Sequence, residues 1–268
     1  LKITDVTTAV KYYPVTSIDN LTFAGNELRL RGFRALLLEQ DNAIFECFGA
    51  ERLLGNDVIR NFVLEIDSRA KQITLNPKET VVKANLRGMI KLNQHSGKMP
   101  VLTIGLAGGE TLQVLFDTGS GAMIDLKTED YNRLISSDAL SLIAEGKGGN
   151  SMGVARVIDN TSLKKVEIPL VSVGTGKFEN IRCIAERLPY SLLGTQLLDY
   201  GKVTIDYSRG RFYFEPFEKA SVNMARKDWN INLSAVSGQL RVSSLWGKMK
   251  DELSVGDEII KIDNEEIK

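Results

Sequence analysis

Asp117, Thr118, Gly119 and Ser120 are the residues whose types and order best suit chemistry in this chain. They lie between two largely apolar runs, residues 112–116 and 122–126, and each run is typical of a β-strand. Packing explains such a segment poorly, because an ionisable side chain flanked by small residues contributes little apolar contact. A carboxylate held between two strands can instead exchange a proton with a bound water or substrate. The segment therefore indicates general acid–base chemistry.

The rest of the chain offers few other catalytic groups. Its only histidine, His95, lies in a polar segment rich in turn-forming residues, and its two cysteines are Cys47 and Cys183. A Ser-His-Asp or Cys-His mechanism needs a well-positioned base, and a His-based zinc site needs several ligands, so we expect neither. The two cysteines are too few for a disulfide framework.

The bulk composition argues against nucleic-acid binding and against a transmembrane helix. Lysine plus arginine and aspartate plus glutamate both number 34 among the 268 residues, so the net charge is zero. Proteins that bind nucleic acid normally carry a basic excess, and we expect no nucleic-acid partner. No apolar run reaches the roughly 18 residues that a transmembrane helix needs.

The chain repeats a pattern at long range. Leu53-Leu54-Gly55 is followed by Asp67, and Leu192-Leu193-Gly194 is followed at the same fourteen-residue distance by Asp206. After each of these aspartates the sequence enters a turn and an alternating strand, which is typical of a β-hairpin. Residues 21–25 and 170–174 also correspond. A repeat of this size predicts two similar lobes.

The elements that must position these groups are mostly strands. Residues 99–106 and 111–116, joined at Gly108 and Gly109, predict a hairpin that leads into Asp117. Residues 127–145 are the clearest helical stretch. A short helix is expected after each Leu-Leu-Gly, and Thr195 is expected to cap the second one.

Together, the Asp-Thr-Gly-Ser segment, a glycine-rich stretch after it and a later Leu-Leu-Gly resemble the retropepsin-like and pepsin-like aspartic peptidases. The resemblance covers about residues 1–217. In that superfamily a flap hairpin covers the substrate, and a segment of two hydrophobic residues and glycine passes behind the catalytic loop. The resemblance implies that Gly146, Gly148, Gly149 and Gly153 belong to the flap and that Leu192, Leu193 and Gly194 support the loop.

The resemblance also assigns roles within the loop. Asp117 would be one of two catalytic carboxylates, which share one proton because two like charges so close cannot both ionise. Thr118 would lock the loop, Gly119 would allow close backbone approach, and Ser120 would donate a hydrogen bond to Asp117. Peptide hydrolysis by such a pair needs no cofactor and no metal.

The first copy of the repeat departs from the family pattern, because it contains no Asp-Thr-Gly. The repeat spacing places the missing aspartate about thirty residues before Leu1. Asp67 and Asp206 stand at strand ends before turns, where aspartate commonly bonds nearby backbone, and we interpret both as structural, as we do Asp125. The resemblance therefore implies that residues 1–90 are the C-terminal part of a first acid-protease lobe and that residues 91–217 are the second lobe.

A change in composition marks a third part of the chain. Residues 218–228 are polar and predict a linker. Residues 229–268, above all Gly256-Asp257-Glu258 before an alternating strand, resemble an incomplete PDZ domain of the bacterial type. PDZ domains bind peptides by adding a strand to a sheet edge, so this resemblance implies a C-terminal peptide ligand. Because only part of the domain is present, we expect it to be loosely held.

Three functions follow as hypotheses. The leading one is an aspartic endopeptidase of two lobes, acting on a peptide or protein substrate. The second is a homodimer in which two Asp117 residues meet, although the repeat argues against it. The third is a peptide-binding protein without catalytic activity. The resemblance further implies a cell-envelope, periplasmic or secreted location, and the oligomeric state is left open.

Overall fold

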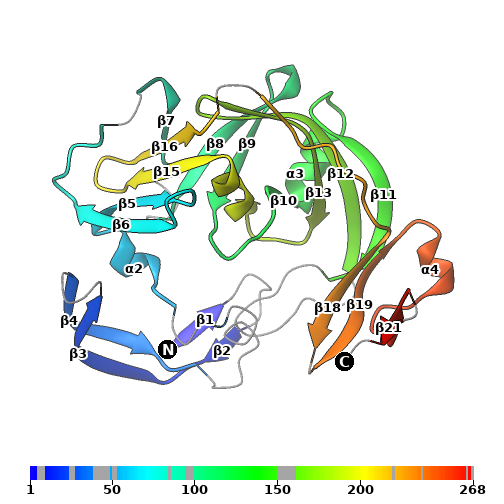
Figure 1. Cartoon of the computed structure of the whole chain (residues 1–268), viewed down its shortest axis with the longest axis horizontal. Coiled ribbons are helices and arrows are strands. Elements are labelled where there is room, and N and C mark those ends of the chain that lie inside the picture. The colour runs from blue at the N-terminus through cyan, green and yellow to red at the C-terminus, as the bar shows by residue number, and fades with distance from the viewer. Residues whose placement is uncertain are drawn as a thin grey trace. The chain divides into compact units, whose positions relative to one another are not determined.

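β-Strands make up most of the regular structure in the computed structural model of the chain (Figure 1), so the expected all-β class is confirmed. The structure describes residues 1–4, 10–23, 28–38, 49, 53–83, 86–93, 99–149, 161–218, 221–236, 238–263 and 265–266. These residues fall into two compact units, one within Leu1–Leu53 and the other within Leu54–Asn150 and Asp159–Lys268. In the described part of the chain, no helix has the length and apolar character needed to span a bilayer.

The first unit contains two antiparallel hairpins. Strand β1 (Lys2–Thr4) pairs with β2 (Val10–Tyr12), and β3 (Val15–Phe23) pairs with β4 (Leu28–Leu36). Apolar and basic residues alternate at the start of β4, which is the period of a strand with one polar face. The register places apolar residues opposite each other, as in the pairing of Ile18 with Phe33.

The second unit is built on a sheet with the strand order β17-β13-β10-β14-β9-β8-β12-β11-β19-β18. A further pairing between β12 and β13 closes β13, β10, β14, β9, β8 and β12 into a six-stranded barrel. The barrel strands are β8 (Val101–Leu106), β9 (Thr111–Phe116), β10 (Ile124–Lys127), β12 (Thr161–Val173), β13 (Gly176–Glu186) and β14 (Ser191–Leu193).

The barrel is filled by the apolar residues that alternate along its strands. Leu102 and Ile104 of β8 and Leu112 and Val114 of β9 are all at most 1% exposed. The predicted hairpin before Asp117 is confirmed, because β8 pairs antiparallel with β9. The turn between them is the 3-10 helix η3 (Ala107–Gly109). This hairpin delivers the chain to Asp117 from a rigid, fully buried core.

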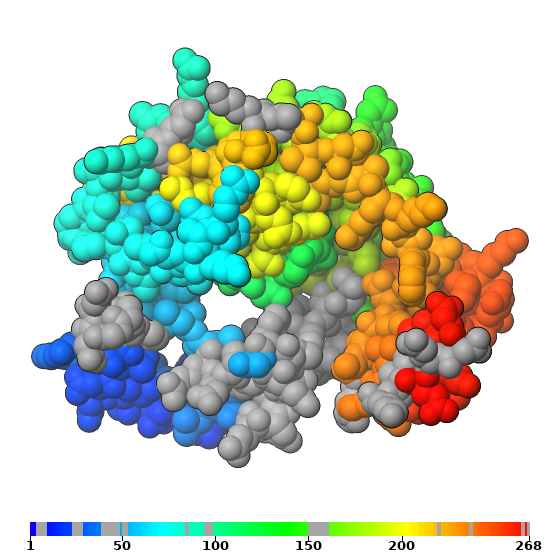
Figure 2. All heavy atoms as spheres, viewed as in Figure 1, coloured from blue at the N-terminus to red at the C-terminus, as the bar shows by residue number. Residues whose placement is uncertain are grey.

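A second sheet, of order β6-β5-β15-β16-β7, joins the two copies of the repeat. Its strands are β5 (Phe62–Asp67), β6 (Gln72–Pro77), β7 (Met89–Lys91), β15 (Gly201–Asp206) and β16 (Arg211–Pro216). In Figure 2 the cyan atoms of β5 and β6 lie against the yellow atoms of β15 and β16, in agreement with the pairing of β5 with β15. The 3-10 helix η2 (Leu86–Gly88) precedes β7.

The pairing of the two copies is symmetric. Each residue of the second hairpin lies 139 positions after its counterpart in the first, as Asp206 does after Asp67. Glu65 pairs with Thr204, its own counterpart, and Leu64 pairs with Ile205, the counterpart of Ile66. A two-fold axis relating the copies therefore passes through the pair of Glu65 and Thr204, which confirms the predicted repeat for these hairpins.

The structural interpretation of Asp67 and Asp206 is also confirmed. Asp67 Oδ1 accepts a hydrogen bond from the backbone N–H of Ala70 at 2.9 Å, and Asp206 Oδ1 accepts one from the N–H of Arg209 at 3.0 Å. Each carboxylate thus closes the turn of its own hairpin.

The segments before these hairpins agree only in part. The predicted short helices are present, as α2 (Asn56–Ile59) after Gly55 and the 3-10 helix η4 (Thr195–Asp199) after Gly194. Leu53 and Leu54, however, lie outside any strand and are 55% and 36% exposed, whereas their counterparts form β14. The difference arises because β14 pairs with a neighbour on each side.

The helix expected over residues 127–145 is wrong in its second half. Helix α3 (Thr128–Leu134) ends in a turn in which the Ser137 hydroxyl donates to the carbonyl of Leu134 at 2.8 Å. The chain then forms β11 (Ser141–Gly148), which pairs with β12. Pairing with strands distant in sequence overrides the local helical pattern, as tertiary contacts commonly do.

The C-terminal segment is part of the second unit. After β17 (Val222–Asn223) come β18 (Ile231–Val236), β19 (Gln239–Trp246), α4 (Met249–Glu252), β20 (Lys261–Ile262) and β21 (Glu265–Glu266). Strand β19 pairs with β11, and Leu245 and Trp246 are fully buried. The expectation that this segment is loosely held is therefore wrong for β19. This strand pairs with β11, and its side chains Leu245 and Trp246 are buried.

Candidate active site

Asp117 lies where the chain leaves β9, in the loop that leads to β10. Strand β14 lies between these two strands: Leu193 pairs with Phe116 in parallel and with Ile124 in antiparallel direction. The Leu192-Leu193-Gly194 segment thus lies between the two strands, β9 and β10, that the Asp117 loop connects. This is the placement behind Asp117 that the sequence resemblance predicts.

Four hydrogen bonds tie the end of β14 to the loop. The N–H of Asp117 donates to the carbonyl of Leu193 at 3.0 Å, and the N–H of Gly194 donates to the carbonyl of Met123 at 3.2 Å. The N–H and the hydroxyl of Thr195 both donate to the carbonyl of Ser120, at 2.8 and 2.9 Å. Thr195 was expected to cap η4, but its hydrogen bonds go to the loop instead. Gly194 occupies the N-cap position of η4, and no side chain caps the helix.

Gly194 is required by this close approach. A Cβ atom at Gly194 would lie 2.6 Å from Ser120 Oγ and 2.7 Å from the carbonyl oxygen of Ser120, and closer still to the carbonyl oxygen of Ala122. Two of these three atoms belong to the backbone and cannot rotate away. Any larger residue at this position must therefore displace the loop that carries Asp117.

The Asp117 side chain is only partly buried, and its loop neighbours Thr118 and Gly119 are exposed. Asp117 Oδ1 accepts a hydrogen bond from the N–H of Gly119 at 2.8 Å, and the carbonyl of Asp117 accepts one from the N–H of Ser120 at 3.2 Å. These bonds orient a carboxylate that water can reach. Thr118 was expected to lock the loop, but Thr195 supplies the locking bonds described above.

Ser120 does not make its expected hydrogen bond to Asp117. Its hydroxyl donates instead to Oδ2 of Asp125 at 2.6 Å and accepts a bond from the N–H of Ala122 at 3.3 Å. The turn of the loop directs the hydroxyl inward, toward β10 and away from the accessible carboxylate. The expected hydrogen bond from Ser120 to Asp117 is therefore wrong, because the Ser120 hydroxyl donates to Asp125. This bond still fixes the loop.

Asp125 is the buried acid of the site, with 8% of its surface exposed. Burial raises the pKa of Asp125, the hydrogen bond from Ser120 opposes that rise, and the nearby charge of Asp117 adds to it. The sequence carried a signal for this residue, because a lone carboxylate interrupts the apolar run of residues 122–126. Its link to Ser120 was visible only in the structure.

The glycines assigned to the flap have packing roles in the described residues. Gly146 and Gly148 lie in β11, where a Cβ atom on Gly146 would come within 2.5 Å of the Trp246 ring. The N–H of Gly149 donates to the carbonyl of Ser243 at 3.0 Å, and Gly153 lies outside the described residues. In the strand order, β8 and β12 stand between β11 and β9, which leads to Asp117.

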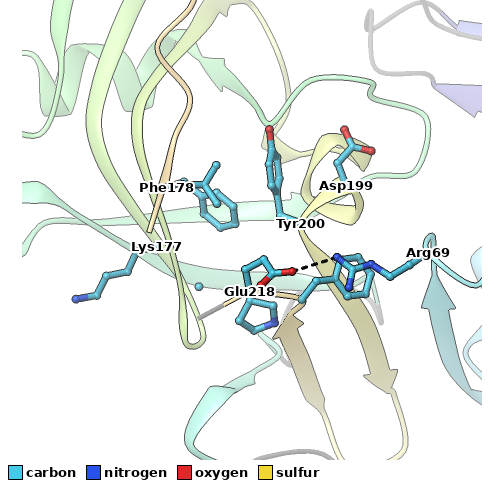
Figure 3. A pocket seen from close by; sticks show the side chains of 10 residues that line it. Arg69, Lys177, Phe178, Asp199, Tyr200 and Glu218 are labelled. Atoms are coloured by element: carbon cyan, nitrogen blue, oxygen red, sulfur yellow. Dashed lines mark hydrogen bonds and ion pairs between the residues drawn. The ribbon is translucent and has the colours of Figure 1, made fainter. Parts of the chain in front are cut away.

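Two cavities in the described residues are lined by residues outside this loop. One, of about 70 Å³, lies beside Phe178 and Tyr200, and Figure 3 shows the ion pair of Arg69 and Glu218 at its edge. Another, of about 240 Å³, is lined by polar groups including Arg182 and Asn223. Neither lining includes Asp117. The first holds no more than a few waters, so we do not regard it as a substrate site.

Among the described residues, no group of three or more His, Cys, Asp and Glu side chains is arranged to hold a metal ion. Comparison with known proteins adds no identification, since no family model, no curated protein and no solved structure matches this chain.

Proposed function

We propose that this protein is an aspartic endopeptidase and that Asp117 is one of its two catalytic carboxylates. The observation that carries the proposal is the way the loop is held. Strand β14 lies between β9 and β10, and its hydrogen bonds fix the loop backbone at Asp117 and at Ser120. A loop built in this way holds an accessible carboxylate rigidly at the end of a buried barrel strand. Rigid placement is what acid–base catalysis on a bound water requires.

The chemistry needs a second carboxylate. Two carboxylates about 3 Å apart hold one proton between them. The ionised member takes a proton from water as that water attacks the peptide carbonyl, and the protonated member stabilises the developing oxygen anion. We propose that the partner of Asp117 belongs to a first-lobe Asp-Thr-Gly upstream of Leu1, which the 139-residue offset between Asp67 and Asp206 would place roughly twenty-three residues before Leu1. The two-fold pairing of β5 with β15 supports a partner related to Asp117 by the same symmetry.

Peptide binding by the C-terminal segment is part of the same proposal. Strand β18 stands last in the order of the large sheet, and in the described part of the chain it pairs only with β19. An edge of this kind can accept a peptide as an additional strand.

The test is cleavage of casein or a fluorogenic peptide by the full-length protein. Asp117→Asn should lower the rate by several orders of magnitude, because it removes one member of the pair while keeping the side-chain shape. Asp138→Asn is the matched control, since Asp138 is an exposed aspartate in the turn after α3, and it should leave the rate unchanged. Undiminished cleavage by Asp117→Asn would refute the assignment.

The same assay on residues 1–268 separates the two-lobe hypothesis from the homodimer hypothesis. This chain holds one Asp-Thr-Gly, so we expect no turnover from it alone. Strong turnover that depends on Asp117 and rises with the square of protein concentration would instead indicate a homodimer with one Asp117 from each copy.

A further inference from the structure

A hydrogen bond joins Ser120 of the candidate catalytic loop to the buried Asp125 of β10. The Ser120 hydroxyl donates to Asp125 Oδ2 at 2.6 Å, and the Ser120 carbonyl receives both bonds from Thr195. Ser120 is thus held from three directions, and its N–H in turn holds the carbonyl of Asp117. A short hydrogen bond to a buried carboxylate is among the stronger ones in proteins. Of these contacts, only the bond from Ser120 to Asp125 brings a carboxylate other than Asp117 into the site.

The surroundings of Asp125 favour an electrostatic link with Asp117. Asp125 lies on β10 and pairs with Leu192 of β14, so apolar residues flank it along the sheet. Charge interactions act strongly in such a poorly solvated position. In the described part of the chain, the titratable groups that interact with it are Asp117 in the loop and the buried thiol of Cys183 on β13. Farther along β10, Lys127 pairs with Glu186 of β13.

We infer that Asp125 is a positioning residue of the candidate active site: it holds Ser120 away from Asp117 and, when ionised, places a negative charge behind the catalytic carboxylate. The inference rests on the proposed function for its catalytic consequence. The bond from Ser120 to Asp125 leaves the Gly119 N–H as the donor to Asp117 Oδ1. The second carboxyl then influences the reaction through Ser120 and through its charge, without touching the substrate.

The charge has a definite effect on the pH profile. An aspartic dyad is active while it holds one proton, and it loses activity at high pH when that proton leaves. A negative charge at Asp125 opposes the formation of a second anion beside it, and this extends activity to higher pH. Replacing Asp125 by asparagine removes the charge but keeps an oxygen that can accept the Ser120 hydroxyl. The alkaline limb of the profile should therefore move to lower pH, by a few tenths to about one pH unit.

The first experiment does not depend on peptidase activity. In residues 1–268 labelled with ¹³C at aspartate carboxyls, NMR titration follows Asp125 directly. Because the charge of Asp117 raises the pKa of Asp125, Asp117→Asn should lower that pKa. Because the Ser120 hydrogen bond lowers it, Ser120→Ala should raise it. If Asp117→Asn leaves the Asp125 titration where it was, the electrostatic link does not exist and the inference is refuted.

Asp130 provides the matched control. Its Oδ2 accepts a hydrogen bond from the Ser191 hydroxyl at 2.8 Å, so it makes the same type of hydrogen bond at the start of α3. Asp130→Asn should leave the Asp125 titration unchanged. A shift as large as that from Asp117→Asn would show a general electrostatic change and would overturn the specific link.

The second experiment measures the pH dependence of kcat/KM for Asp125→Asn, Asp130→Asn and the unmodified full-length protein. Only Asp125→Asn should move the alkaline limb, while its fold, followed by circular dichroism, stays unchanged. An active Asp125→Asn with an unaltered profile would refute the positioning role and leave the proposed function intact. An inactive full-length protein would refute the proposed function, and the NMR titration would still decide the link between Asp117 and Asp125.

Discussion

Gly194→Ala is the sharpest test of the loop architecture. The new methyl group would lie 2.6 Å and 2.7 Å from the hydroxyl and carbonyl oxygens of Ser120. The hydroxyl can rotate, but the Ser120 carbonyl also receives both Thr195 bonds and cannot move alone. Overpacking of this kind costs about 1–3 kcal/mol. Glycine-to-alanine replacement itself restores about 0.4–1 kcal/mol by restricting the unfolded chain. Because two of the three clashing atoms are backbone oxygens, the cost lies near the upper end of that range, and the net loss is about 2 kcal/mol.

Gly121→Ala is the control within the same loop. A Cβ atom at Gly121 would meet no heavy atom within 4 Å, so only the effect on the unfolded chain applies, and the variant should be neutral or slightly more stable. Thermal unfolding should separate the two. For a domain of roughly this size, 2 kcal/mol corresponds to a fall in Tm of about 4–8 °C.

Amide hydrogen exchange locates the effect. The N–H groups of Asp117 and Thr195 donate across the contact between β14 and the loop. If Gly194→Ala loosens that contact by about 2 kcal/mol, their exchange should accelerate about thirtyfold. Equal Tm values for Gly194→Ala and Gly121→Ala, with unchanged exchange at both amides, would refute the argument that β14 supports the loop.

Three further predictions concern buried groups of the second unit. Lys165 is almost fully buried and pairs with Asp228, which is 28% exposed, at 2.8 Å. Lys165→Met leaves Asp228 without this partner and should cost about 1–3 kcal/mol in urea unfolding. Lys164→Met breaks a more exposed pair and should cost under about 1 kcal/mol, and equal losses would contradict this. Burial acts to raise the pKa of Asp206, but hydrogen bonds from Ser208 and Arg209 outweigh it and lower that pKa below its ordinary value of 3.8. The stabilisation is therefore present above about pH 4 and lost as the pH falls through the lowered value, so Asp206→Asn should be less stable by about 2 kcal/mol at pH 7 and should approach the unmodified protein below pH 3; a gap independent of pH would contradict this. Burial, with a smaller effect from Asp125, raises the pKa of the Cys183 thiol, so alkylation mapped by mass spectrometry should modify Cys183 only after unfolding; rapid native labelling would contradict its buried position.

The sequence alone determined features whose signals lie within a few residues of each other. The hairpin of β8 and β9 follows from alternating apolar residues around Gly108 and Gly109, and both strands were expected in the right places. The turns at Asp67 and Asp206 were predictable because a short side chain at a strand end bonds the backbone three residues later. The repeat was visible as two matched spacings.

Only the tertiary structure decided which distant segments meet. Residues 141–145 carry a pattern that suits a helix, yet they form the start of β11 because β12 supplies a partner strand along them. Ser120 was assigned to Asp117, its sequence neighbour, whereas the turn of the loop brings its hydroxyl to Asp125. Hydrogen-bond partners depend on direction as well as proximity, and direction is set by how the backbone turns. The spacing of residues in the sequence therefore indicated the candidate catalytic loop, and its three-dimensional packing determined what holds that loop in place.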